Sequence, residues 1–309
     1  MIKYYKTIDN VITEIDAAES GCWVSCIAPD SDEISALVND FGLDSGFVKS
    51  SLDEEESSRI ETEDDQTLVI VDYAVAEADA SNSVQYYTMP MGIILTKTNV
   101  VTISLKDNVI LEEMRSGSVK NIQTHLKTQF ILLVLFRIAT KYLQYLKNID
   151  KLSLFLEKQL HRSLKNKELI QLLALEKSLV YFSTSLKADE MTLEKILRGR
   201  VIKLYEEDQD LLEDVLIEIK QAIEMSNIYS SILSGTMDAF ASIINNNVNL
   251  VMKRLTIITI IMAIPTMVFS YYGMNVANLP FADSPFPFPL VISLVVTAVT
   301  AAILLKKEK

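Results

Sequence analysis

The chain has 309 residues, of which 49% are apolar and 23% are charged, and its formal net charge is −12. An acidic protein of this kind repels the phosphate backbone of nucleic acids, so we expect cations and not nucleic acid among its partners. The length is sufficient for one large soluble domain and a membrane module.

The first 120 residues alternate between helical and extended patterns. Residues 13–18 resemble a turn or linker, residues 21–28 resemble a strand, and Ser31 opens a helix. Three later segments alternate β-branched and aromatic side chains with polar ones, which predicts strands joined by turns. These segments are residues 68–73, 84–95 and 99–105. We therefore expect a small α/β domain over residues 1–120.

From residue 121 onward the pattern is helical. None of the seven prolines lies between Pro90 and Pro265, and this interval is rich in Leu, Lys, Glu and Ile at spacings of three and four residues. We expect a helical segment over residues 121–188. Its predicted helices cover residues 121–147, 151–163 and 166–186, the last two as an antiparallel hairpin.

A long helix, here called the stalk helix, is predicted over residues 189–254 and continues into the membrane. Its mostly apolar stripe repeats at steps of three and four residues, apart from one gap at Asp208. At about 1.5 Å per residue this helix exceeds ~100 Å, which is more than a compact domain buries. We expect the stripe to pack against other copies of the chain, with the core of an intramolecular bundle as the alternative. The stripe consists of Val201, Leu204, Leu212, Val215, Ile219, Ala222, Ser226, Tyr229, Leu233, Met237, Phe240, Ile244, Val248, Met252 and Leu255.

The last part of the chain is almost free of charge. Between Arg254 and Lys306 the only charged side chain is Asp283. Two apolar runs in this interval are each long enough to cross a hydrocarbon core of about 30 Å once. Buried helices of a soluble core are the alternative, but such helices normally have a polar face. We expect spans over residues 255–272 and 286–305, an outer loop over residues 273–285 and a basic tail over residues 306–309.

Basic residues flank the predicted spans on one side only. Lys253 and Arg254 precede the first span, Lys306, Lys307 and Lys309 follow the second, and the connecting loop has neither Lys nor Arg. By the positive-inside rule, both termini are cytoplasmic. We expect a multi-pass protein of the inner (plasma) membrane with its acidic domain inside the cell.

Two helices cannot enclose a water-filled path, so transport would require several copies around an axis. One face of the first span carries only small or hydroxyl side chains beyond Leu255, which fits a pore lining and fits a helix-packing seam equally well. The spans lack carboxylates, His and Lys, which favours passive flow over a proton-coupled carrier. The membrane potential contributes about 4.6 kcal/mol per 100 mV for a divalent cation. The predicted pore stripe is Met252, Leu255, Thr259, Ala263, Thr266 and Ser270.

A short motif, Tyr272-Gly273-Met274-Asn275, follows the first span directly. At the end of the penultimate span, with a short loop and one more span after it, this motif resembles the Y-G-M-N signature of the CorA family of magnesium transporters. The similarity covers essentially the whole chain. It includes Met252-Lys253-x-Leu255-Thr256, Leu52-Asp53-x-Glu55 and Arg59-Ile60-Glu61.

The motif suits the chemistry of Mg²⁺, which holds its water tightly and demands octahedral geometry at about 2.0–2.1 Å. A ring of neutral Asn275 amides can bind the waters of a hydrated ion, and Gly273 permits close backbone approach. We expect a selectivity filter made of Gly273, Met274 and Asn275. A helix C-cap, with Gly273 as the helix terminator, is the alternative role of Asn275.

The resemblance implies a homopentameric funnel with an αβα cytoplasmic domain, a stalk helix and an all-α membrane part in the lipid bilayer. It implies transport of Mg²⁺, and also of Co²⁺ and Ni²⁺, by a protein that is not an enzyme. It further implies closure by intracellular Mg²⁺ bound between protomers.

Aligned on the signature, Asp214 and Asp238 fall on acidic positions of the family's stalk helix. The resemblance makes Asp214 half of a regulatory metal site, with a solvated acid among the many of residues 206–218 as the alternative. It makes Asp238 an acidic ring below a hydrophobic gate of Met252 and Leu255. The other half of the regulatory site stays open between Asp72, Glu77 and Asp79.

The outer loop departs from the family pattern. It reads Val-Ala-Asn-Leu-Pro-Phe over residues 276–281 and has Asp283 as its only acid, so cations are gathered less strongly at the mouth. A related family that transports Zn²⁺ carries Gly-Val-Asn where this chain has Met274. A Zn²⁺ transporter of the same superfamily and a non-conducting, membrane-anchored helical scaffold remain the alternatives.

Overall fold

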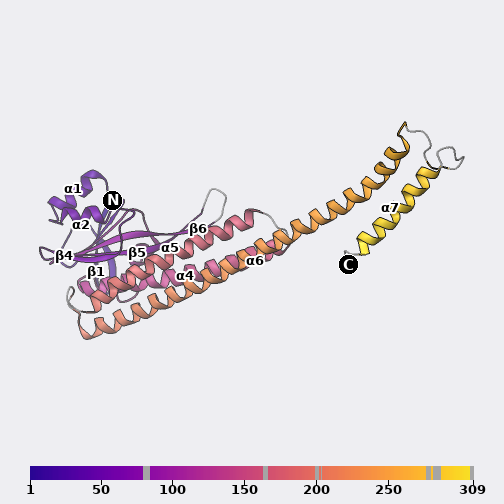
Figure 1. Ribbon diagram of the computed structural model, residues 1–309. Helices are drawn as coiled ribbons and strands as arrows, with labels where there is room; N and C mark the ends of the chain where they lie inside the picture. The colour runs from indigo at the N-terminus through magenta and orange to yellow at the C-terminus, as the bar shows by residue number, and fades with distance from the viewer. Residues whose placement is uncertain are drawn as a thin grey trace. The chain divides into compact units, whose positions relative to one another are not determined.

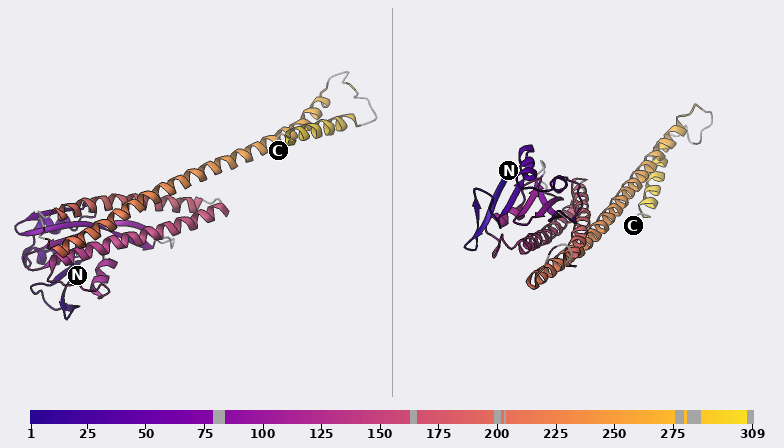
Figure 2. Two further views of the ribbon diagram at one scale, coloured as in Figure 1. Left: turned by 90° about the horizontal axis from the view of Figure 1, so that it is seen from below. Right: turned by 90° about the vertical axis from the view of Figure 1, so that its left-hand side faces the viewer.

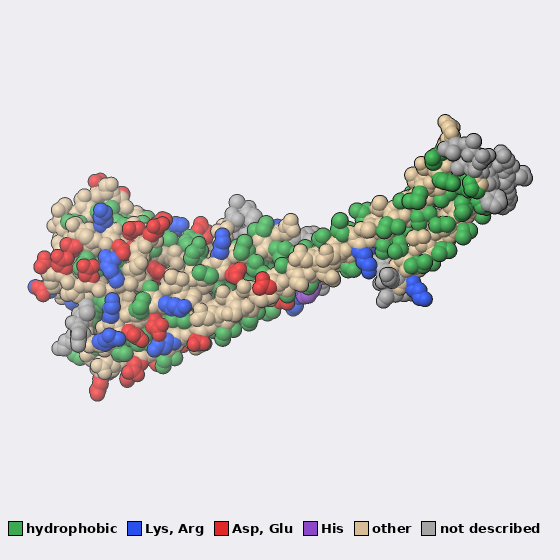
Figure 3. Space-filling model, in the orientation of Figure 1, with side chains coloured by type: hydrophobic (Ala, Val, Ile, Leu, Met, Phe, Trp, Pro, Cys, Tyr) green, Lys and Arg blue, Asp and Glu red, His purple; other side chains and the backbone are tan. Residues whose placement is uncertain are grey.

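The computed structural model describes residues 1–78, 84–162, 166–198, 202, 204–275, 280 and 287–306. It divides into two compact units, Met1–Met237 and Asp238–Lys309, and each is described by itself. Acidic side chains are spread over the first unit, whereas the visible surface of the second unit is mainly hydrophobic (Figure 3).

The first unit is built on a seven-stranded sheet in the order β2-β1-β3-β7-β6-β5-β4. The strands β3 and β7 pair in parallel, with Trp23 opposite Val100, and the other described pairs are antiparallel. The strands are β1 (Ile2–Ile8), β2 (Val11–Ile15), β3 (Trp23–Ile27), β4 (Arg59–Glu63), β5 (Gln66–Ala78), β6 (Val84–Leu95) and β7 (Val100–Ser104).

Two hairpins of this sheet were not predicted. The interpretation of residues 13–18 as a turn or linker is wrong at its start, because Thr13 lies in β2 and pairs with Lys6 of β1. The turn is at Asp9 and Asn10, both with positive φ, and Asp64 and Asp65 make the same kind of turn between β4 and β5. These turns use Asp and Asn in left-handed backbone without a glycine, so the strongest hairpin signal is missing.

Helices cover the sheet on both sides, which confirms the predicted αβα domain (Figure 1). On one side lie α1 (Ser31–Asn39) and α2 (Ser45–Ser50), capped at their N-termini by Asp30 and Asp44. Leu37, Phe47 and Val48 of these helices belong to one core cluster with residues of β3, β5, β6 and β7. The short α3 (Val109–Arg115) follows β7.

The other side of the sheet is covered by α4 (Lys127–Arg162) and α5 (Asn166–Leu197). Trp23 and Phe130 lie with ring centroids 5.2 Å apart, and Tyr142 and Phe182 meet edge to face at 5.1 Å. The predicted helix ending at residue 147 is wrong. The buried side chains of Leu146 and Ile149 continue one stripe through this point, and no helix-breaking residue interrupts it.

The predicted start of the stalk helix at residue 189 is also wrong. Residues up to Leu197 belong to α5, and α6 spans Glu206–Tyr272. Leu193 and Ile196 are buried on the same stripe as the earlier part of α5, so core packing extends that helix beyond its predicted end.

The first part of α6 packs within the first unit (Figure 2). Leu212, Val215, Ile219 and Ala222 are buried in the single chain, and the hydroxyl of Ser226 donates to the Leu179 carbonyl at 2.8 Å. The expectation that this stripe packs against other copies of the chain is therefore wrong for its first part. The alternative of an intramolecular core holds there, because α5 covers the stripe.

The second unit contains the remainder of α6 and α7 (Phe288–Lys306). Among the described residues, α6 is long and apolar enough to cross a membrane, and Phe288–Leu304 is a shorter apolar helix. Met262 and Met267 of α6 and Leu294 of α7 are 66%, 72% and 62% exposed in the single chain. Apolar surface of this extent requires lipid or other protein chains to cover it.

Candidate functional site

The C-terminal part of α6 has one face that is occupied within its own chain. Ile257, Ile261, Ile264 and Val268 are partly shielded from solvent. The helix α7 runs beside this part of α6 in both views, and the ring centroids of Tyr272 and Phe288 lie 6.4 Å apart (Figures 1 and 2). We conclude that this face of α6 packs against α7.

The predicted pore stripe lies on the opposite face. All six of its residues are exposed. At 3.6 residues per turn, Thr259, Ala263, Thr266 and Ser270 lie about half a turn from Ile261 around the helix. The stripe is therefore not a packing seam between the two helices of one chain, and it is left open to other copies, to lipid or to water.

The threonines of the stripe have defined hydroxyl orientations. Thr259 Oγ1 donates to the Leu255 carbonyl at 2.9 Å, and Thr266 Oγ1 donates to the Met262 carbonyl at 3.2 Å. A hydroxyl whose proton is used in this way offers only its oxygen lone pairs to other groups. The water molecules around a hydrated cation turn their hydrogens outward, so these oxygens suit a hydrated cation as acceptors.

The Gly-Met-Asn motif lies where α6 ends. Tyr272 is the last helical residue, and the N–H of Gly273 still donates to the Phe269 carbonyl at 2.9 Å. Gly273 does not adopt left-handed backbone, unlike Gly21, Gly42 and Gly117, but a Cβ there would lie 3.1 Å from that carbonyl oxygen. Glycine is favoured by this close approach and not by a left-handed C-cap. Asn275 follows outside the helix and is exposed.

Two acidic residues of α6 are predicted to bind a regulatory metal ion. Asp214 and Asp238 are both exposed and lie several turns apart on α6. Within the described residues, no group of three or more His, Cys, Asp or Glu side chains could hold a metal ion.

The three candidates for the other half of the regulatory site differ in their surroundings. Glu77 accepts a hydrogen bond from the Tyr87 hydroxyl at 2.6 Å and lies 3.9 Å from the Lys106 ammonium. Asp72 lies beside the buried Asp189 of α5. Asp79 lies outside the described residues. The hydrogen bond between Asp72 and Asp189 was not predicted from the sequence. Its one sign there is that the acidic Asp189 falls on the apolar stripe of α5.

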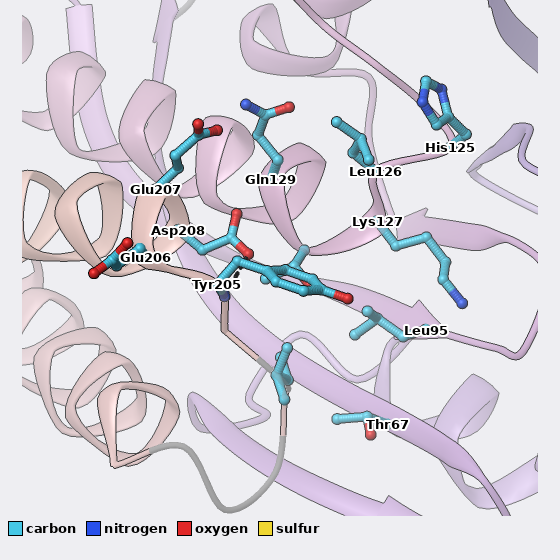
Figure 4. Close-up of a pocket in the computed structure, with 12 residues that line it drawn as sticks. Thr67, Leu95, His125, Leu126, Lys127, Gln129, Tyr205, Glu206, Glu207 and Asp208 are labelled. Atoms are coloured by element: carbon cyan, nitrogen blue, oxygen red, sulfur yellow. Dashed lines mark hydrogen bonds between the residues drawn. The ribbon is translucent and has the colours of Figure 1, made fainter.

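A pocket of about 840 Å³ lies in the first unit between the starts of α4 and α6 (Figure 4). Two of its charged side chains are engaged in local hydrogen bonds. Lys127 donates to the carbonyls of Thr96 and Lys97 at 2.7 and 2.8 Å, and burial lowers its pKa. Asp208 accepts from the N–H of Tyr205 at 3.0 Å and so caps α6. We assign these groups a structural role.

The comparisons with known proteins agree with this architecture. The family described as CorA-like Mg²⁺ transporter protein matches residues 18–307. The cobalt/magnesium transport protein CorA of Methanocaldococcus jannaschii is 30% identical over 281 residues, which cover 90% of this chain and 87% of that protein.

Two solved structures have the same fold. The complete structure of the CorA magnesium transporter from Methanocaldococcus jannaschii has a TM-score of 0.80 at 24% identity and covers 99% of this chain and 96% of that one. The cytoplasmic domain of ZntB from Vibrio parahaemolyticus has a TM-score of 0.62 at 13% identity and covers 80% of this chain and 97% of that one. Because both sequence identities are below 25%, these two matches show that the folds are alike and no more.

Proposed function

Because the chain belongs to the CorA family of Mg²⁺ transporter proteins, we propose that it is a channel-type membrane transporter for divalent cations. Mg²⁺ is its main substrate, and Co²⁺ and Ni²⁺ are further substrates. The relative at 30% identity is named for cobalt and magnesium transport. The proteins of this family are ion transporters and not enzymes. The observation that carries the proposal is the exposed, weakly polar stripe of α6 on the face away from α7.

The transporter is an oligomer, and we propose five copies. One α6–α7 hairpin cannot surround a passage, so copies of α6 stand around the axis with α7 outside them. Ile303 and Leu294 of α7, which are 59% and 62% exposed in the single chain, then face lipid. Both chain termini lie in the cytoplasm, as the basic residues Arg254 and Lys306 at the ends of the spans favour.

Selectivity arises where the passage meets the Gly-Met-Asn motif. Gly273, Met274 and Asn275 of each copy form a ring in which the Asn275 amides bind the waters of a hydrated ion. A neutral amide holds the ion less tightly than a carboxylate and so releases it faster. Thr259 and Thr266 accept hydrogen bonds from the same waters within the membrane. The membrane potential drives inward flow.

Intracellular Mg²⁺ closes the passage by binding between copies. The exposure of Asp214 and Asp238 supports this role, because a neighbouring copy can reach both side chains. The absence of a three-ligand cluster in the described part of one chain is consistent with sites that two copies complete together. Asp238 forms a ring below the hydrophobic gate of Met252 and Leu255.

The test is metal uptake by vesicles that contain the purified full-length protein, with an inside-negative potential. We expect uptake of Mg²⁺, Co²⁺ and Ni²⁺ by the wild type and its loss in Asn275→Ala. The matched control is Asn148→Ala, an exposed asparagine of α4, which leaves uptake unchanged. Size-exclusion chromatography should give the same oligomer for all three proteins.

Each other outcome decides against part of the proposal. Full Mg²⁺ uptake by Asn275→Ala would remove the filter assignment. Uptake of Zn²⁺ in preference to Mg²⁺ would identify a Zn²⁺ transporter. Vesicles that remain closed to every divalent metal would identify a non-conducting scaffold.

A further inference from the structure

A second pocket of the first unit opens between the start of β6, the last part of α4 and the first part of α5. Its volume of about 850 Å³ lies in the range of about 300–1,000 Å³ that is typical of small-molecule sites. The strand contributes residues 84–87, α4 contributes Leu152, Phe155 and Leu156, and α5 contributes one face between residues 167 and 181. We call this pocket the α5 groove.

The inner wall of the α5 groove is held in place by contacts within the protein. The buried hydroxyl of Ser178 donates to the Tyr86 carbonyl at 2.7 Å and so ties α5 to β6. The buried ring of Tyr86 lies with its centroid 5.6 Å from that of Tyr145 and 6.4 Å from that of Phe182. The wall is therefore formed before any ligand binds, which lowers the entropic cost of binding.

The outer part of the groove is apolar and open to solvent. Phe155 of α4 and Ile170 and Tyr181 of α5 are each more than half exposed in the single chain. All three line the groove. A ligand with an apolar body would remove this surface from water, which is favourable in proportion to the area covered.

The charged side chains of the groove are all of one sign. Among its described lining residues, Lys167 and Lys177 are the charged ones, and no Asp or Glu joins them. Neither lysine forms an ion pair or a hydrogen bond with the part of the chain that the structure describes. The neighbouring Glu168 lies on the buried stripe of α5. In a chain of formal net charge −12, this groove is a local site of positive potential and attracts anions.

The spacing of the two lysines indicates how an anion would lie. They are ten positions apart, which is about 15 Å along α5. Ile170 and Ala174 lie between them in the groove. One small head group cannot reach both lysines, so an apolar body fits between them and a head group at one end.

We propose that the α5 groove binds a small amphipathic anion, a carboxylate with a linear apolar chain. The chain lies along α5 over Ile170 and Ala174 and covers Phe155. The carboxylate pairs with Lys167 or Lys177 at the end of the groove. This ligand site goes beyond transport and does not depend on the proposed function.

Calorimetric titration of the full-length protein in nanodiscs of neutral lipid tests the proposal, with hexanoate, octanoate and decanoate as probes. Each further methylene should raise the association constant about fourfold. Ala174→Trp fills the groove and should abolish this binding. The matched control Val180→Trp, at an exposed position of α5 outside the groove, should retain it. The difference between the two variants removes the part of the probe that enters the lipid.

The preference for an anion is tested with octanol and octylammonium, which have the same chain length as octanoate. The wild type should bind octanoate several-fold more tightly than either. In the double variant Lys167→Gln, Lys177→Gln, octanoate should bind no more tightly than octanol, and the affinity for octanol should not change. The control Lys187→Gln, Lys195→Gln, at exposed positions of α5 outside the groove, should keep the preference.

Three results would overturn the proposal. The first is equal binding of octanoate by Ala174→Trp and Val180→Trp. The second is a wild-type affinity for octanol as high as that for octanoate. The third is a smaller oligomer for Ala174→Trp alone in size-exclusion chromatography, which would assign the groove to a contact with a second copy. Ile170→Glu, which brings a carboxylate into the groove and should repel octanoate, replaces Ala174→Trp if that variant fails to fold.

Discussion

The two halves of α6 carry similar apolar repeats in different surroundings. Leu212, Val215 and Ile219 in the first half are at most 1% exposed, whereas Ile258 and Met262 in the second half are 58% and 66% exposed. The spacing of apolar residues therefore reports which face of a helix is apolar and not what covers that face. The first unit supplies its own cover, whereas the apolar side chains of the second unit stay exposed in the single chain.

Matched substitutions in the two halves of α6 test whether they differ in this way. Ile219→Ala should lower the free energy of unfolding of the first unit by about 2–5 kcal/mol, because it leaves a cavity under α5. Ile258→Ala should change the same quantity by less than about 0.5 kcal/mol, because the side chain is exposed in the single chain. Urea unfolding followed by the fluorescence of Trp23, the one tryptophan of the chain and fully buried, measures both. Equal effects would mean that the two units do not unfold independently.

The first unit shields ion pairs as well as apolar side chains, and removing one ion pair should have a smaller effect on its free energy of unfolding. Burial opposes the ionised form of Glu113, but hydrogen bonds from Arg137 and from Lys141, the latter at 2.9 Å, outweigh it and lower its pKa. A lowered pKa stabilises the fold above the ordinary Glu value of about 4.3, and this stabilisation is lost as the pH falls through the lowered value. Glu113→Gln should therefore cost about 1–3 kcal/mol at neutral pH and almost nothing in strong acid.

The same unfolding assay, repeated from neutral to acid pH, measures the effect of Glu113→Gln. The neighbouring Glu112 is exposed, and Glu112→Gln serves as the control with little change at any pH. A constant difference between wild type and Glu113→Gln across this range would contradict the assignment of charge to the Arg137–Glu113–Lys141 group.

Much of the fold could be predicted where the local pattern and the tertiary structure agree. The segment 84–95 forms one strand with the predicted bounds, because its β-branched and aromatic residues occupy the middle of the sheet. The predicted helix end at residue 147, inside α4, and the predicted start of the stalk helix at residue 189 were both wrong. The polar residues Asn148 and Lys187 lie directly after two of the predicted helix ends, but both side chains are exposed while their neighbours stay in the core.

The candidate site was less accessible from the sequence. Periodicity placed Thr259, Ala263 and Thr266 on one face, and the motif at Asn275 suggested the end of a span. Only the structure places that face away from α7. The pairing of Asp72 with Asp189 joins a strand to a helix far along the chain, and no local pattern contains such a contact.

Thiol labelling tests most directly whether the exposed stripe of α6 lines a water-filled passage. The native Cys22 and Cys26 are fully buried, and burial raises the pKa of both, that of Cys26 to about 12, so they do not compete. In vesicles treated with a charged, water-soluble thiol reagent, Thr266→Cys should be modified and its Mg²⁺ uptake should stop. Ile261→Cys, on the face packed against α7, should remain unmodified and active. Modification of Ile261→Cys but not of Thr266→Cys would contradict the account.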